Sequence, residues 1–235
     1  MEASISFKSL SKKIDKKSIL AGLSFGIEKH SNFSFYGPIS SGKSAILKLI
    51  SGLIYKDKGY LYINGKDINI NPVDIKFEIG YMPQKNDLYK NLNLLDNIVL
   101  YSEFYNISKE KAKNKTKILS EKLNINNYIY KKPFETNECI NKIAIFIRSI
   151  LHNPNIILLD QPTTGLDLYY EEILWDYISE SSDKTIIFST NKLSEVKAYS
   201  ERLAYIEDFS IKYIGDCDSF LDTKYQYISN DIKKI

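Results

Sequence analysis

The feature that most restricts the fold of this chain is a glycine-containing loop between an apolar strand and a helix. Residues 37–44 read GPISSGKS and match the pattern GxxxxGK[ST]. They follow the apolar segment FSFY and precede the helix-forming run AILKLISGLI. In such a loop, successive backbone N–H groups and a helix N-terminus form a concave site for anions. The pattern in this context predicts a phosphate-binding turn inside an α/β fold.

Each residue type in the loop has a chemical reason. Side chains at Gly37 and Gly42 would obstruct the wrap of the backbone around a phosphate. Lys43 is expected to reach the outer phosphates, and Ser44 to offer its hydroxyl to Mg²⁺. The residues expected to bind nucleotide are Gly37, Pro38, Ile39, Ser40, Ser41, Gly42, Lys43 and Ser44. The alternative is a strand-to-helix turn without a ligand, and the flanking strand and helix disfavour it.

Apolar segments elsewhere place the chain in the α/β class. Residues 156–160 (IILLD) and 185–189 (TIIFS) are continuous apolar strands, separated by a helix-forming segment at 168–181. Continuous apolar strands between helices predict a parallel sheet covered on both faces. The other expected elements are β segments at 5–10, 23–28 and 33–36, a type I′ hairpin at 59–70 around Asn64-Gly65, helices at 91–124 and 137–151, and a hairpin at 203–215.

Composition excludes several other classes of protein. Among the 235 residues, the longest apolar runs fall far short of the ~18 residues that span a bilayer, so we expect no membrane span. Two cysteines and two histidines exclude a disulfide framework and most zinc chemistry. With a net charge of +3 and Arg148 and Arg202 as the only arginines, no nucleic-acid partner is expected. The N-terminus is not built like a secretory signal, which predicts a cytoplasmic protein.

Two further segments complete a resemblance to the ATP-binding subunits of ABC transporters. YMPQ at 81–84 resembles the family's Q-loop, and LLDQPTTGLD at 158–167 resembles its Walker B strand and D-loop. The resemblance implies an ABC-type P-loop NTPase core with an antiparallel β subdomain, bound to ATP and Mg²⁺. It also implies Ser44, Gln84 and Asp160 as the Mg²⁺ residues. We expect one nucleotide-binding domain over 1–235, with a helical subdomain at about 85–153 inserted in the α/β core.

The resemblance also implies partners. Two such domains close head to tail, with each ATP between the phosphate loop of one subunit and the LSGGQ signature of the other. The expected dimer-interface residues are Asn137, Glu138, Cys139 and Asp167. A membrane-embedded permease would hold the pair at the inner face of the cell membrane. Residues 88–108 are similar to the subgroup that serves exporter-type drug, peptide or lipid systems.

The signature position departs from the family. It falls on TNECI at 136–140, and no glycine occurs between Gly80 and Gly165. The side chains of Glu138 and Cys139 would obstruct the approach of backbone N–H groups to a phosphate. A carboxylate about 4 Å from a phosphate charge is repelled by ~4 kcal/mol at an effective dielectric near 20. In structural terms, Asn137 is expected to cap a helix whose positive end Glu138 favours.

Four other family positions are changed. Gln161 stands where the catalytic glutamate would polarise water, and Asn191 stands where the switch histidine would contact the γ-phosphate. The aromatic residue that stacks on adenine would fall near Ile14, and Ser40 replaces a loop glycine. The pattern predicts a subunit that binds Mg-ATP and hydrolyses it poorly or not at all, paired with an intact paralogue.

Two alternatives stay open at this point. The first is an active transport ATPase in which Glu171, Glu172 or another acid replaces the missing base. The second is a soluble ABC-type regulator without a permease. The Q-loop and the helical insert argue against the regulator, because by resemblance those parts dock onto a permease.

Overall fold

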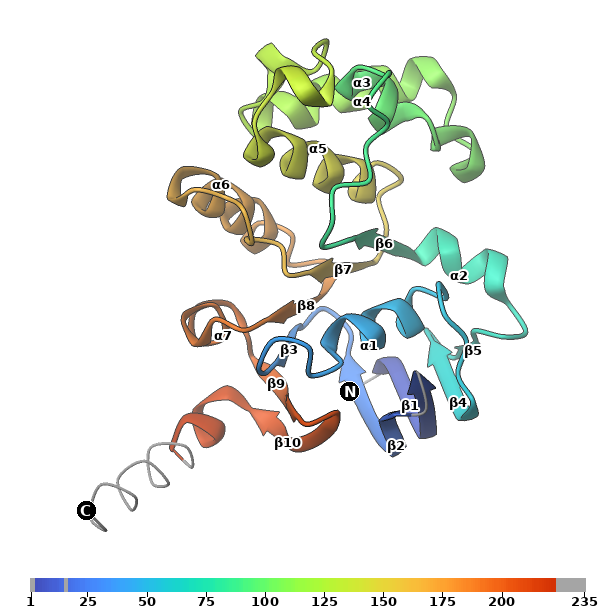
Figure 1. Ribbon diagram of the computed structural model, residues 1–235. Helices are drawn as coiled ribbons and strands as arrows, with labels where there is room; N and C mark the ends of the chain where they lie inside the picture. Colours follow the sequence, from blue (N-terminus) through green and yellow to red (C-terminus); the bar gives the residue numbers. More distant parts are fainter. Residues whose placement is uncertain (1–2, 15–16, 223–235) are drawn as a thin grey trace, which may run out of the picture.

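The computed structural model describes residues 3–14 and 17–222, which form two sheets and a helical body (Figure 1). The larger sheet has the strand order β10-β9-β3-β8-β7-β6, and the smaller one has the order β2-β1-β4-β5. The strands are β1 (Ala3–Ile14), β2 (Lys17–Glu28), β3 (Asn32–Tyr36), β4 (Lys58–Ile63), β5 (Lys66–Asp67), β6 (Ile79–Met82), β7 (Ile156–Asp160), β8 (Thr185–Thr190), β9 (Arg202–Glu207) and β10 (Ser210–Asp216). The helices are α1 (Lys43–Ile50), α2 (Pro72–Glu78), α3 (Leu94–Val99), α4 (Lys109–Lys122), α5 (Glu138–Ile150), α6 (Leu168–Ser179) and α7 (Leu193–Tyr199), with 3₁₀ turns η1 (Ser102–Tyr105), η2 (Asn126–Tyr128) and η3 (Pro133–Glu135).

The larger sheet is parallel through its centre. β3 pairs in parallel with β8 and β9, and β7 pairs in parallel with β8 and β6. Ile157 and Leu159 of β7 belong to the cluster that includes α5 and α6, whereas Ile156 and Leu158 pack with α1. Because both faces are covered, the whole of β7 is buried, and its run is apolar until Asp160. The predicted parallel sheet and the strand at 156–160 are confirmed.

The smaller sheet is antiparallel, and its β4–β5 hairpin forms at the predicted place. The backbone φ angle is 46° at Asn64 and 78° at Gly65, as a type I′ turn requires. The second strand is shorter than predicted, since β5 ends at Asp67 rather than at Ile70. The carboxylate of Asp67 accepts a hydrogen bond from the backbone N–H of Asn69, and this turns the chain away from the sheet.

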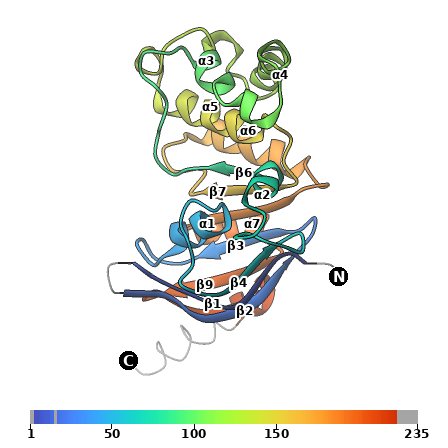
Figure 2. The same cartoon turned by 90° about the vertical axis from the view of Figure 1, so that its right-hand side faces the viewer.

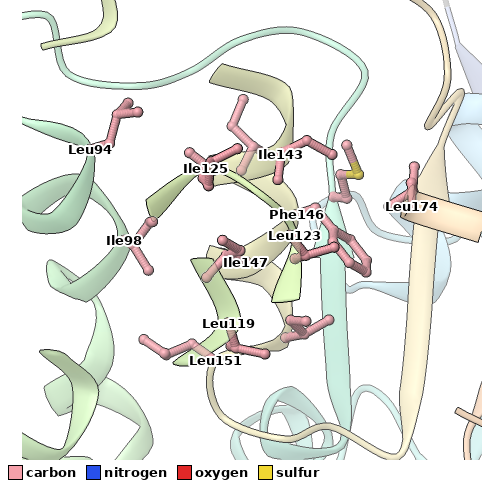
Figure 3. Close-up of a cluster of buried hydrophobic side chains, with 14 of the residues drawn as sticks. Leu94, Ile98, Leu119, Leu123, Ile125, Ile143, Phe146, Ile147, Leu151 and Leu174 are labelled. Atoms are coloured by element: carbon pink, nitrogen blue, oxygen red, sulfur yellow. The ribbon is translucent and has the colours of Figure 1, made fainter. Parts of the chain in front are cut away.

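The helical body shares its hydrophobic core with one face of the larger sheet. Figure 3 shows Leu94 and Ile98 of α3 beside Leu119 of α4 and Ile143 and Ile147 of α5. Figure 2 shows this body above the larger sheet, with the smaller sheet on the opposite side. Within the described residues, no helix combines the length and apolarity that crossing a bilayer requires. The helical body thus forms a layer over this face of the larger sheet and packs onto it through α5.

The helix predicted over 91–124 is broken into shorter pieces. Asn106, with a φ of 57°, ends η1 in a left-handed conformation, and the Ser108 side chain then caps α4. The predicted helix at 137–151 is nearly unbroken as α5. Asn137 caps it by accepting a hydrogen bond from the N–H of Ile140 at 2.9 Å, so the capping prediction is confirmed.

Candidate functional site

The loop at 37–44 connects β3 to α1 in a conformation that the sequence explains. A Cβ atom on Gly37 would lie 2.0 Å from the carbonyl oxygen of Ile206, so only glycine fits there. Gly42 has a φ of 105° immediately before α1 begins at Lys43. Ser40, which replaces a family glycine, has a φ of 63° and so carries its side chain in the left-handed region. The loop therefore keeps the wrapped backbone despite this substitution.

The ammonium group of Lys43 lies inside the loop. Its Nζ donates to the carbonyl oxygens of Gly37 at 2.8 Å and Pro38 at 2.5 Å, and to Oγ of Ser41 at 3.3 Å. The residue is 3% exposed, and burial lowers the pKa of Lys43 while the charge of Asp160 opposes that shift. A buried cation facing a cavity of about 350 Å³ favours binding of an anion in that cavity.

Asp160 ends β7 at the edge of the sheet where the loop begins. Its Oδ1 accepts hydrogen bonds from Oγ of Ser44 at 2.8 Å and Oγ of Ser189 at 2.7 Å, and Tyr81 donates to Oδ2 at 3.4 Å. Mg²⁺ is held by one or two carboxylates and the phosphates of its substrate. Ser44 and Asp160 fit such an ion, and within the described ranges no cluster of His, Cys, Asp and Glu offers another metal site.

Sequence reasoning missed Tyr81 and Ser189, which orient Asp160. Burial and the charge of Asp160 raise the pKa of Tyr81, so its hydroxyl stays a donor at neutral pH. Tyr81 stands three residues before Gln84, and Ser189 stands near the end of β8. The sequence signal for both residues is a polar side chain near the carboxyl end of a strand that lies parallel to β7.

Gln84, which is expected to hold Mg²⁺, contacts Gln161. Its Nε2 donates to Oε1 of Gln161 at 3.1 Å. Gln161 has a φ of 50°, and its backbone N–H donates to Oγ of Ser189 at 3.0 Å. These contacts direct the Gln161 side chain toward the cavity that Lys43 and Ser44 line. The structure therefore brings both predicted glutamines together beside the phosphate loop.

Asn191 lies exposed just after β8, next to a partly buried ionic cluster that sequence reasoning missed. Lys192 donates to Oγ1 of Thr163 at 3.1 Å and forms ion pairs with Glu171 and with Glu195, the latter at 3.4 Å. Glu195 is 5% exposed and also accepts from Thr163. Glu171, one of the acids considered as a substitute base, is thus held by a lysine.

The four predicted interface residues lie together within this one chain. Cys139 donates through Sγ to the carbonyl oxygen of Gly165 at 3.4 Å and to Oδ2 of Asp167 at 3.6 Å. A Cβ atom on Gly165 would meet Oε1 of Glu138 at 2.6 Å, so the Glu138 side chain packs over the D-loop. Asp167 caps α6, as Asn137 caps α5. The start of α5 therefore packs directly on the D-loop.

Lys142 is a site residue that the sequence reading overlooked. Its Nζ donates to the carbonyl oxygens of Gln161 at 3.0 Å and Thr164 at 2.6 Å. The residue is 6% exposed, and burial lowers the pKa of Lys142 although Glu138 and Asp160 oppose that shift. Helical spacing places Lys142 opposite the apolar stripe of Ile140, Ile143 and Ile147, so the sequence offered no signal for it. It fixes the segment after Asp160 to α5.

His152 lines a second cavity of about 460 Å³, between the helical body and the larger sheet. Its Nε2–H donates to the carbonyl oxygen of Ile79 at 3.0 Å, and its ring stacks on Tyr105 with centroids 3.9 Å apart. Nδ1 is buried with no hydrogen-bond partner in the part of the chain that the structure describes. Burial lowers the pKa of His152 to about 4.

This shift predicts a loss of stability in acid. Because the folded-state pKa lies below the ordinary value of 6.5, stability is complete above that pH and falls as the pH drops toward 4. The loss due to this one group is about 2 kcal/mol at a pH of about 5. Urea unfolding of wild type and of His152→Phe, which keeps the ring stack, measures it as the difference between the two pH profiles. Parallel profiles would contradict the assignment.

Comparisons with known proteins agree with this geometry. A family model described as ABC transporter matches residues 20–164. An ABC transporter ATP-binding protein of Methanocaldococcus jannaschii is 30% identical over 92% of this chain and 78% of its own length. The ABC transporter ATP-binding protein NatA of Bacillus subtilis is 26% identical over 89% of this chain and 88% of its own length. Nod factor export ATP-binding protein I of Burkholderia thailandensis is 26% identical over 88% of this chain and 68% of its own length.

Two solved structures share the fold. One is an ATP-binding subunit of an ABC transporter, with a TM-score of 0.83 and 21% identity over 95% of this chain and 92% of the other. The second is a dimeric ATP-binding cassette in a post-hydrolysis state bound to ADP and phosphate, also with a TM-score of 0.83, at 24% identity over 91% and 98%. The predicted fold, a parallel sheet with an antiparallel β subdomain, is confirmed.

Proposed function

This chain belongs to the ABC transporter family of ATP-binding proteins, and we propose that it binds Mg-ATP within an exporter-type transport complex while hydrolysing it poorly. The observation that carries the proposal is the contrast between two neighbouring positions. Asp160 is held in contact with Ser44 beside the phosphate loop, whereas the next residue, Gln161, carries an amide where a base is needed. The binding residues are kept, and the base is lost.

Binding is supported by the arrangement of the loop. Lys43 and the N-terminus of α1 supply positive charge to one cavity, and Ser44 and Asp160 supply the oxygen ligands for Mg²⁺. When bound, Mg²⁺ neutralises charge on the outer phosphates. The hydrogen bonds from Ser189 and Tyr81 hold the Asp160 carboxylate in place at that edge of the sheet. The Asp160 carboxylate is therefore oriented before nucleotide enters.

Poor turnover is supported by three changes. The Gln161 amide cannot accept a proton from water, and general-base assistance contributes roughly 10²- to 10⁴-fold to rate. Asn191 is exposed and carries a neutral amide, so it cannot supply the cationic hydrogen-bond donor that a histidine ring supplies. Glu138 would face the phosphate of an opposing subunit as a like charge. These changes affect hydrolysis rather than the cradle that holds the nucleotide.

The partners are proposed from the same evidence. A homodimer would repeat Gln161 and Glu138 at both composite sites, so we propose pairing with an intact paralogue and docking on a membrane permease. Relatives named for Nod factor export and for linearmycin resistance support an exporter-type system at the inner face of the cell membrane. We also propose that residues 1–235 form one nucleotide-binding domain with a helical subdomain at about 85–153.

Direct measurement of binding and turnover tests the proposal. Calorimetry with the purified chain is expected to show Mg-ATP binding, while phosphate release stays close to the buffer baseline. Co-purification from the native host is expected to recover a second ATP-binding subunit and a multi-span protein. A self-sufficient homodimer that hydrolyses ATP briskly would contradict the proposal, and so would a chain with no affinity for adenosine triphosphate.

The active-ATPase alternative has weaker support. Glu171 is held in an ion pair by Lys192, and Glu172 lies exposed on α6. The ion pair occupies the Glu171 carboxylate, so that carboxylate is not free to contact the attacking water. A regulator without a permease would leave Gln84 and the helical body without the docking partner that the family resemblance implies for them.

A further inference from the structure

The turn between β9 and β10 carries an aromatic side chain in a strained conformation. Asp208 and Phe209 form a two-residue turn between the paired residues Glu207 and Ser210, with φ angles of 48° and 57°. Positive φ at both positions defines a type I′ turn, which favours Gly, Asn or Asp. Asp208 suits the turn, but a bulky aromatic residue there is an outlier. Strain of this kind points to a functional reason for keeping the side chain.

The fold places this turn beside the phosphate loop. β9 runs parallel to β3, so both strands end at the same edge of the sheet. The approach is close, since the carbonyl oxygen of Ile206 lies 2.0 Å from the position of a Cβ atom on Gly37. Phe209 consequently lines the same cavity of about 350 Å³ as Lys43 and Ser44. Its ring packs partly on the hydrophobic cluster that contains Ile206 and α1.

We propose that Phe209 is the platform on which the base of the bound nucleotide stacks. The inference rests on the proposed function, because it assigns the base end of a site whose phosphate end is the loop at 37–44. The cavity has the size of a small-ligand site, with the cation of Lys43 in one wall and the ring of Phe209 in another. Every base has a π-face, and base–aromatic stacking contributes substantially to nucleotide affinity. Phe209 is thus a positioning residue for nucleotide.

The test separates base recognition from phosphate recognition. Calorimetry compares wild type, Phe209→Leu and Phe209→Trp, each titrated with Mg-ATP and with Mg-tripolyphosphate, which has no base. Leucine keeps the apolar packing but removes the π-face, so affinity for ATP is expected to fall roughly 10- to 100-fold. Tryptophan keeps the stack and is expected to keep the affinity. Tripolyphosphate is expected to bind all three proteins alike, because the phosphate loop is unchanged.

Each outcome decides the inference. If Phe209→Leu binds ATP as tightly as wild type does, the platform is elsewhere and the inference is wrong while the proposed function stands. If the variant loses ATP and tripolyphosphate equally, Phe209 supports the shape of the loop and the stacking role is also wrong. If wild type binds neither ligand, the proposed function fails first. Loss of ATP affinity alone, restored by tryptophan, is the supporting result.

Discussion

Replacing Gln161 by glutamate is expected to raise the rate of ATP hydrolysis by roughly 10²- to 10⁴-fold, the usual contribution of a general base. The carboxylate would follow Asp160 directly and would face the cavity lined by Lys43 and Ser44. It fits without rearrangement, because Gln84 donates to Oε1 of Gln161, and a glutamate oxygen accepts equally well. Thr164 donates to the same atom at 3.4 Å.

The measurement needs a background in which the opposing site allows turnover. Glu138→Gly with Cys139→Gly removes the side chains that would obstruct an opposing phosphate and removes the repelling carboxylate. Phosphate release is compared in that background with and without Gln161→Glu. Gln161→Met is the matched control, since it removes the amide and supplies no base. If wild type already hydrolyses ATP briskly and Gln161→Glu leaves the rate unchanged, the loss of the base has no consequence and the pseudo-ATPase proposal is wrong.

The features predicted correctly from the sequence are those that local chemistry determines. The strand at 156–160 is buried on both faces, so every residue up to Asp160 is apolar. The turn at Asn64-Gly65 and the cap at Asn137 each depend on residues within a few positions in the chain. Ser44 and Asp160 lie 116 positions apart, and only the family resemblance, which implies both as Mg²⁺ residues, indicated that they would meet.

The features that were missed depend on contacts between distant segments. Lys142 looks like a solvated helix residue, and only the fold shows that its ammonium reaches two carbonyl groups 19 and 22 positions away. Phe209 reads as an ordinary hairpin residue, and its proximity to the phosphate loop follows from β9 lying next to β3. The interruption of the helix at 91–124 depends on Asn106 adopting positive φ, which helix propensity does not encode. The base-stacking residue was expected near Ile14, whose side chain the structure does not describe.

Replacing Lys43 by methionine is expected to weaken Mg-ATP binding by roughly 10²-fold or more, because each charge-assisted hydrogen bond to phosphate contributes about 1.5 to 3 kcal/mol. The affinity for tripolyphosphate is expected to fall by a similar factor, since the lost contacts are to phosphate. This distinguishes Lys43 from Phe209, whose replacement is expected to spare tripolyphosphate. Calorimetry with both ligands measures the difference.

The matched control is Lys122→Met, which removes an exposed lysine at the end of α4, far along the chain from the loop. It changes the net charge by the same amount, so a loss shared by both variants would be a general electrostatic effect. Lys43 also donates hydrogen bonds to the carbonyl oxygens of Gly37 and Pro38, which the variant lacks. Binding to Lys43→Met is therefore measured at a temperature below the unfolding midpoint of that variant. Equal Mg-ATP affinity of Lys43→Met and wild type would contradict the assignment of the loop at 37–44 as the phosphate-binding site. Because the Gln161 prediction presupposes bound nucleotide, the Lys43 experiment decides whether any argument about turnover applies to this chain.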